Sequence, residues 1–167
     1  YDATDAAGKA AIQVTRTITV QDTTAPTITL LGANPQILEC PSPYVELGAT
    51  AIDTCYLNLG AVVIDASAVD ANIPGTYVVT YNISDTSGNA ATPVQRTVVV
   101  QDSIAPIITL NGLSSLSLEC HVDVYLENGA GVTDACDPNV AVIIGGDTVD
   151  ANTVGAYVVT YDAIDVN

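Results

Sequence analysis

The stretch Gly75-Thr-Tyr-Val-Val-Thr-Tyr-Asn-Ile-Ser84 alternates its side chains with a period of two, which is typical of a half-buried β-strand. Its glycine allows a sharp entry into the strand. Tyr77 stands where a tyrosine corner would return its hydroxyl to the preceding loop, and Tyr157 repeats the position. The plain alternative is that Tyr77 and Tyr81 cover one face of a sheet.

This stretch belongs to a unit that recurs every 80 residues. Tyr1, Tyr81 and Tyr161 open the related phrases YDATDAAGK, YNISDTSGN and YDAIDVN. A repeat of this length is one small domain used serially. The period divides the chain into residues 1–22, the C-terminal part of a preceding repeat; residues 23–102, a complete domain; and residues 103–167, a domain without its last strand. Serial domains multiply length and valency, which favours a spacer, stalk or filament.

The final strand of the repeat has a counterpart at the other end of the chain. Residues 90–101 supply this strand to the complete domain, and residues 10–21 carry the matching phrase. Two interpretations follow: the chain is a window of a longer tandem protein, which we favour, or a subunit that donates its first strand to a neighbour. In both, residues 11–20 of one copy complete residues 103–167 of another, head to tail. The residues expected to enter the neighbour are Ala11, Ile12, Val14, Ile18 and Val20.

Short strands separated by Gly and Pro fill the complete repeat. The expected strands are residues 27–31, 36–39, 48–52, 61–64, 75–84 and 95–100. No stretch sustains a helical pattern. About seven short strands in 80 residues predict an all-β fold of tandem immunoglobulin-like sandwiches.

Composition limits the partners. The chain has 19 acidic and 3 basic residues and a formal net charge of -16, which repels phosphate backbones and attracts divalent cations. Nucleic acid is therefore an unexpected partner. No apolar run reaches the roughly 18 to 20 residues of a membrane helix, so we expect no membrane insertion in this segment.

The four cysteines form two pairs by spacing. Cys40 and Cys55, and Cys120 and Cys136, each flank a predicted turn within one repeat, at Leu47-Gly48 and near Asn128-Gly129. We expect a cross-strand disulfide in each repeat, with free buried thiols as the alternative. Oxidised pairs predict a location outside the reducing cytosol.

Several phrases resemble a known family. These are Asp22-Thr-Thr-Ala-Pro-Thr-Ile-Thr-Leu30, Leu47-Gly-Ala-Thr-Ala-Ile-Asp53, Pro74-Gly-Thr-Tyr-Val-Val-Thr-Tyr81 and Ser84-Asp-Thr-Ser-Gly-Asn89. Together they are similar to the bacterial immunoglobulin-like repeats related to hyalin (HYR) repeats, which occur in tandem in large secreted and cell-surface proteins. The resemblance implies extracellular adhesion, spacing or fibre formation and does not imply catalysis.

Calcium is the expected cofactor, if any is bound. Aspartates stand in the linkers, beside the second cysteine and in the last turn of each repeat, where hard oxygen ligands could rigidify a junction. The alternative is ordinary turn chemistry, in which Asp is a favoured residue. The candidate ligands are Asp22, Asp53, Asp85, Asp102, Asp134 and Asp165.

The sequence predicts a structural protein and no enzyme. His121 is the only histidine, and its counterpart in the preceding repeat is Pro41, so the repeats share no histidine site. We expect an extracellular filament, fibre or surface stalk built by self-association or by continuation of the tandem chain. The alternatives are an adhesin that binds a glycan or a surface protein, and the accessory region of a secreted hydrolase.

Overall fold

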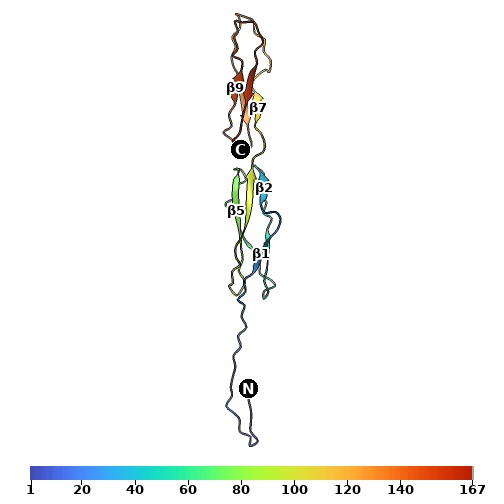
Figure 1. Cartoon of the computed structure of the whole chain (residues 1–167), viewed down its shortest axis with the longest axis vertical. Coiled ribbons are helices and arrows are strands. Elements are labelled where there is room, and N and C mark those ends of the chain that lie inside the picture. Colours follow the sequence, from blue (N-terminus) through green and yellow to red (C-terminus); the bar gives the residue numbers. More distant parts are fainter. Residues whose placement is uncertain (167) are drawn as a thin grey trace.

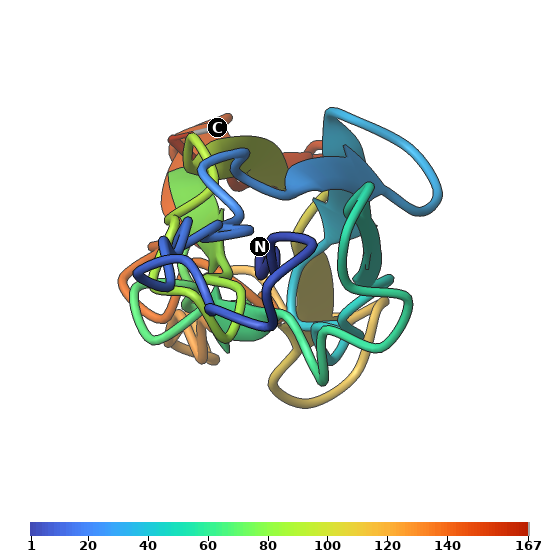
Figure 2. The ribbon, with the colours of Figure 1, turned by 90° about the horizontal axis from the view of Figure 1, so that it is seen from below.

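The computed structural model of the chain describes residues 1–166 and shows a rod (Figure 1). Two all-β domains, residues 23–102 and 103–166, lie end to end, and residues 1–22 leave the central domain at the end opposite the second domain. Viewed along the rod, the tail and both domains project onto one another (Figure 2). The described residues contain ten strands and no helix, as the sequence predicts.

The central domain is a sandwich of two sheets. In one sheet, β1 (Thr27–Leu30) pairs antiparallel with β3 (Ala49–Ile52). The other has the order β2-β6-β5-β4, formed by β2 (Gln36–Glu39), β4 (Val63–Asp65), β5 (Gly75–Asn82) and β6 (Val94–Gln101). All six expected strands are confirmed, with ends shifted by up to two residues. Strand β6 is central, because β5 pairs with it antiparallel and β2 pairs with it parallel.

The core lies between these sheets. Alternate residues of β5 and β6 point inward, including Val79, Tyr81 and Val98, each 0% exposed. The tyrosine corner is confirmed, because the Tyr77 hydroxyl donates a 2.7 Å hydrogen bond to the Ile73 carbonyl. Tyr157 repeats it with the Thr153 carbonyl at 3.0 Å.

The second domain has the same plan with fewer strands. Strand β7 (Ile107–Leu110) pairs with β8 (Ala130–Thr133), and β9 (Ile143–Gly146) pairs with β10 (Val159–Asp162). Residues 116–119, the counterpart of β2, form no strand, because β2 pairs only with β6 and no described segment holds the β6 position here. Among the described residues, every fully buried apolar side chain lies between residues 28 and 100.

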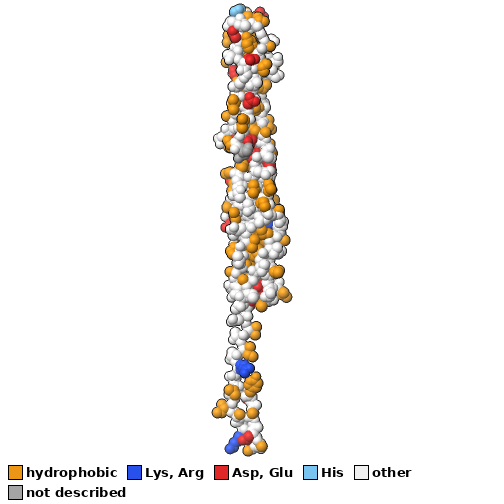
Figure 3. Space-filling view, in the orientation of Figure 1, with side chains coloured by type: hydrophobic (Ala, Val, Ile, Leu, Met, Phe, Trp, Pro, Cys, Tyr) orange, Lys and Arg blue, Asp and Glu red, His pale blue; other side chains and the backbone are white. Residues whose placement is uncertain are grey.

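Residues 1–21 are exposed, and Asp22 is half-buried. Residues 1–14 form a small hairpin, in which Thr4 and Ala10 form a bridge, the Ala11 amide donates to the Ala3 carbonyl at 2.7 Å, and the Tyr1 ammonium donates to the Val14 carbonyl at 2.9 Å. Residues 15–22 run as an extended chain to the central domain. The apolar side chains of residues 1–21 project into solvent, and Figure 3 shows them along the thin end of the molecule. Ile12 and Val20 are 94% and 93% exposed.

The predicted cysteine pairing is wrong. Cys40 is bonded to Cys136 with the Cα atoms 6.0 Å apart, and Cys55 and Cys120 are free thiols. The expected turn exists, with Gly48 at φ 83°, but the chain passes there from β2 in one sheet into β3, which pairs with β1 in the other sheet. Cys40 follows β2 and Cys55 follows β3, so the two cysteines do not face each other across a hairpin. The bond therefore joins the two domains instead of closing a hairpin within one.

Candidate assembly site

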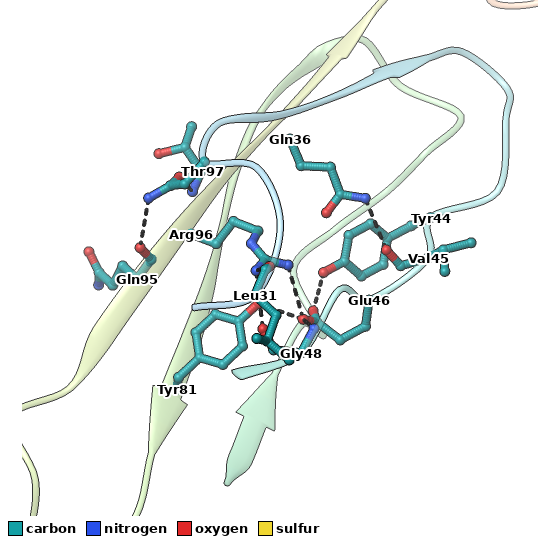
Figure 4. Close-up of polar contacts among 11 residues, drawn as sticks. Leu31, Gln36, Tyr44, Val45, Glu46, Gly48, Tyr81, Gln95, Arg96 and Thr97 are labelled. Atoms are coloured by element: carbon teal, nitrogen blue, oxygen red, sulfur yellow. Dashed lines mark hydrogen bonds and ion pairs between the residues drawn. The ribbon is translucent and has the colours of Figure 1, made fainter. Parts of the chain in front are cut away.

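Arg96 of β6 is the centre of a buried polar cluster in the central domain (Figure 4). Its side chain is fully buried and donates to Glu46 Oε1 at 3.2 Å, to the Gly48 carbonyl at 3.2 Å, and to the Leu31 carbonyl. The guanidinium also lies 5.5 Å from the centre of the Tyr81 ring, within range of a cation–π interaction. Arg96 thereby ties β6 to the residues beside β1 and β3 of the other sheet.

Glu46 is the acceptor that organises this cluster. It receives hydrogen bonds from the Tyr81 hydroxyl and the Gly48 amide, both at 2.6 Å, and from the Tyr44 hydroxyl. Desolvation raises the pKa of Glu46, but these hydrogen bonds and Arg96 outweigh it, so the net pKa is lowered. Desolvation and the bond to Glu46 raise the pKa of Tyr81 to about 12. The carboxylate is thus held ionised.

The second domain repeats the cluster around Glu127. Its carboxylate accepts from the Tyr161 hydroxyl and the Gly129 amide, both at 2.6 Å, and from the Tyr125 hydroxyl. The Asn111 amide donates to the Gly129 carbonyl at 3.0 Å, as the Leu31 amide does to Gly48. No described cation pairs with Glu127. The receptor that holds Arg96 in the central domain is therefore preformed here.

A groove of about 570 Å³ opens over this second cluster. Tyr125, Glu127 and Tyr161 line it together with Leu116, Leu118 and Val159. Its walls include residues 116–119 and β10, and their counterparts in the central domain, β2 and β5, both pair with β6. Val79 is 0% exposed there, whereas its counterpart Val159 is only half-buried. The groove has the place and lining expected of a β6-type strand.

Residues 11–20 have the sequence that such a strand requires. Arg16 corresponds to Arg96, Ile18 to the fully buried Val98, and Val20 to Val100. The chain has only two arginines, and both stand at this one position of the repeat. The structure places residues 1–22 away from the groove of their own chain, so the two surfaces could meet only between copies (Figure 1).

Five of the six predicted metal ligands lie at the end of each domain where the preceding linker enters. Asp102, Asp134 and Asp165 offer carboxylate oxygens that lie within 4.8 Å of one another, and Asp22, Asp53 and the Cys55 sulfur form the corresponding group. The sixth residue, Asp85, is instead bonded to Asn89, whose side chain donates to Asp85 Oδ2 at 2.8 Å. Linker, loop and last turn thus converge in residues 103–166, whereas in the central domain Asp85 of the last turn stays outside the group.

The carboxylates of these groups suit a hard cation. One carboxylate oxygen each of Asp22, Asp53, Asp102 and Asp134 is buried and accepts no hydrogen bond from the described protein atoms. The other oxygen of Asp134 holds the turn, accepting from the amides of Cys136 and Asp137 at 2.8 Å. Hydrogen bonds within the turns therefore account for one carboxylate oxygen of each residue. The second oxygen lies near the other carboxylates of its group. Converging carboxylate oxygens of this kind are what Ca²⁺ binds.

Three residues of the candidate site were missed from the sequence: Glu46, Glu127 and Arg16. The signal was present, because one tyrosine and one glutamate recur before each predicted turn, and both arginines share one repeat position. The sequence did not show that Arg96 is buried, because arginine side chains are exposed in most proteins.

The match to a protein family agrees with the fold. Residues 28–100 match the family described as bacterial surface protein, Ig-like domain. The chain is 36% identical over 104 residues, 58% of its length, to an uncharacterized 81.3 kDa protein of Acholeplasma phage L2, and spans 14% of that protein's length. A solved lipoprotein of Bacteroides thetaiotaomicron shares 29% identity at a TM-score of 0.38, covering 52% of this chain and 45% of that one.

The central domain is therefore an immunoglobulin-like β-sandwich, and its residues 28–100 are similar to the Ig-like domains of bacterial surface proteins. The relation to hyalin repeats stays a prediction. Together with the disulfide, the family match indicates an extracellular or cell-surface location. Residues 1–166 contain no helix that could cross a membrane.

Proposed function

We propose that this chain is a structural unit of an extracellular filament or stalk, in which residues 11–20 of one copy fill the groove of residues 103–166 in the next. The observation that carries the proposal is the preformed cluster around Glu127, which has every acceptor of the Arg96 site and no described cation. The occupant is a second copy, because Arg16 stands at the repeat position of Arg96.

The donated strand would add two kinds of interaction. Arg16 would pair with Glu127 and lie over the Tyr161 ring, while Ile18 and Val20 would be buried as Val98 and Val100 are. Residues 116–119 would gain a parallel partner, as β2 does from β6. Backbone pairing gives such a complex its affinity and the buried side chains set its register.

The contact is heterologous, so it propagates. The donating and accepting surfaces lie at opposite ends of the rod, and one copy can therefore use both at once (Figure 1). A head-to-tail contact of this kind builds an open fibre unless its rotation closes a ring. Where further repeats follow in one polypeptide, the same strand would come from the chain itself.

Calcium at the domain ends is the second part of the proposal. The unbonded oxygens of Asp102 and Asp134 support it, because buried carboxylates without partners are costly. An ion there would link the inter-domain linker to the second domain and stiffen the rod. In the assembled fibre, Asp22 and Asp53 would do the same at the joint between copies.

Substitution of Arg16 tests the assembly. We expect Arg16→Leu to remove the ion pair that anchors the strand and to shift the sedimentation profile from long polymers toward monomers. Lys9→Gln is the matched control, since it also removes one positive charge from the tail but lies outside the donated strand. Equal polymerisation of Arg16→Leu and the control would contradict the proposal.

A further inference from the structure

We infer that a disulfide between Cys120 of one copy and Cys55 of the next seals each joint of the fibre, so that the polymer is covalent along its whole length. This inference rests on the proposed function, since it needs the head-to-tail joint. The observation behind it is that Cys40 and Cys136 are bonded across the junction inside the chain. In the repeat, Cys120 corresponds to Cys40 and Cys55 corresponds to Cys136.

The turn that holds Cys55 has the same hydrogen bonds as the turn that holds Cys136. The Cys55 amide donates to Asp53 Oδ1 at 2.7 Å, and the Cys136 amide donates to Asp134 Oδ1 at 2.8 Å. The residue after each cysteine donates to the same oxygen, at 3.0 Å and 2.8 Å. Both cysteines therefore occupy equivalent turns, each at the end of its domain where the preceding linker enters. The Cys55 thiol is exposed there, beside the tail that would enter the neighbouring copy.

Cys120 lies at the opposite end of the molecule. It follows the segment equivalent to β2, and its thiol lies 3.3 Å from the Asn152 carbonyl in the distal loops. Cys40 has a matching position in the central domain, where its amide donates to the Gln101 carbonyl at 2.8 Å. Gln21 corresponds to Gln101, so the donated strand would bring this same contact to Cys120.

A second contact between the two domains of one chain, that of Glu39 with Ser103, also has counterpart residues at the two ends of the molecule. Glu39, directly before Cys40, accepts from the Ser103 amide at 2.7 Å and from the Ser103 hydroxyl at 3.0 Å. Glu119 precedes Cys120, and Thr23 corresponds to Ser103 with a hydroxyl of its own. The same clamp would therefore align two copies before the sulfurs react.

The bond forms by thiol–disulfide exchange. A small-molecule disulfide such as oxidised glutathione accepts two electrons; the Cys55 and Cys120 thiols lose two protons, one S–S bond forms between them, and the oxidant leaves as two thiols.

The test uses the full chain, assembled with oxidised glutathione and then denatured without reductant. We expect a covalent ladder on gel electrophoresis that collapses to monomers with dithiothreitol, and a peptide joining Cys55 to Cys120 in mass spectrometry. Cys55→Ser and Cys120→Ser should each abolish the ladder. An equal mixture of the two variants should give covalent dimers and nothing larger, because only one productive pair remains. Joint replacement of Cys40 and Cys136 by serine should leave the ladder intact.

Sedimentation of the same samples under native conditions separates the two claims. Polymers without a Cys55–Cys120 link would overturn this inference and leave strand donation standing. Absence of polymers and of the link would overturn both. Dimers formed by either single variant alone would also contradict the inference, because they would show like-with-like pairing of exposed thiols.

Discussion

The Arg96 and Glu46 side chains show how a small acidic domain uses one of its few cations. Arg96 is completely buried, yet its guanidinium meets a carboxylate, two carbonyls and an aromatic face. A buried charge is tolerated only when it is paired in this way. The same cluster stands at Glu127, so the residue that fixes β6 within one domain is also the residue that would fix one copy to the next.

Replacement of Arg96 should separate stability from assembly. We expect Arg96→Leu to destabilise the central domain by about 3–5 kcal/mol, because it leaves the Glu46 carboxylate in the core without its cation. Arg16→Leu should leave the unfolding free energy of the central domain unchanged, since Arg16 is exposed in the single copy. Urea denaturation followed by circular dichroism measures both. Equal destabilisation by the two variants would contradict the assignment.

Glu46 should make stability depend on acid pH. Its folded pKa lies below the ordinary value of 4.5, so its contribution is complete above that pH and is lost as the pH falls through the folded pKa. We expect the urea midpoint to fall steadily below pH 4.5. Glu46→Gln should have a lower midpoint at pH 7 and a shallower fall in acid. Parallel pH profiles for the two proteins would show that other carboxylates control acid unfolding.

At the scale of the element, the positions of the strands could be predicted from the sequence, but their pairing could not. Alternation and turn residues predicted where the strands lie, because those signals are local. The partner of each strand is set by tertiary packing, and there the cysteine spacing misled. It suited a hairpin, but the chain through Gly48 passes from β2 in one sheet to β3 in the other. The approach of Asp102, Asp134 and Asp165 follows from the repeat, which brings linker and loops to one end of the domain, while metal binding there stays a prediction.

The donated strand should show a two-residue pattern of sensitivity. Ile18→Asp would place a charge where Val98 is fully buried, so we expect loss of polymers in light scattering. Thr15→Asp is the matched control, because its counterpart Gln95 is exposed. Equal loss with both variants would point to general repulsion within the tail instead of strand insertion.

Residues 116–119 should change state on assembly. They form no strand in the single copy, and a donated strand would give their amides partners. Hydrogen–deuterium exchange should therefore slow at these residues and at 11–20 in the polymer, with β5 and β6 of the central domain unchanged. Unprotected residues 116–119 in the polymer would exclude strand donation.

At the scale of the whole molecule, length comes from joining like domains through a disulfide, a linker and a convergent acidic group. If Ca²⁺ binds these groups, chelation should lower the melting temperature, because the ion stabilises only the folded chain; at about 100 times the Kd the loss is about 2.7 kcal/mol. Asp134→Asn should remove most of this difference, and Asp65→Asn, at a turn outside both groups, should keep it. An unchanged melt with chelator would leave turn chemistry as the whole role of these aspartates.

Electron cryomicroscopy of the assembled chain is the most direct measurement of the central claim. The account predicts that residues 11–20 of one copy lie in the groove of the neighbour's second domain, antiparallel to β10, with Arg16 against Glu127 and Tyr161. It would be contradicted by a polymer in which the tail lies outside that groove, or by a tail folded back onto residues 103–166 of its own chain.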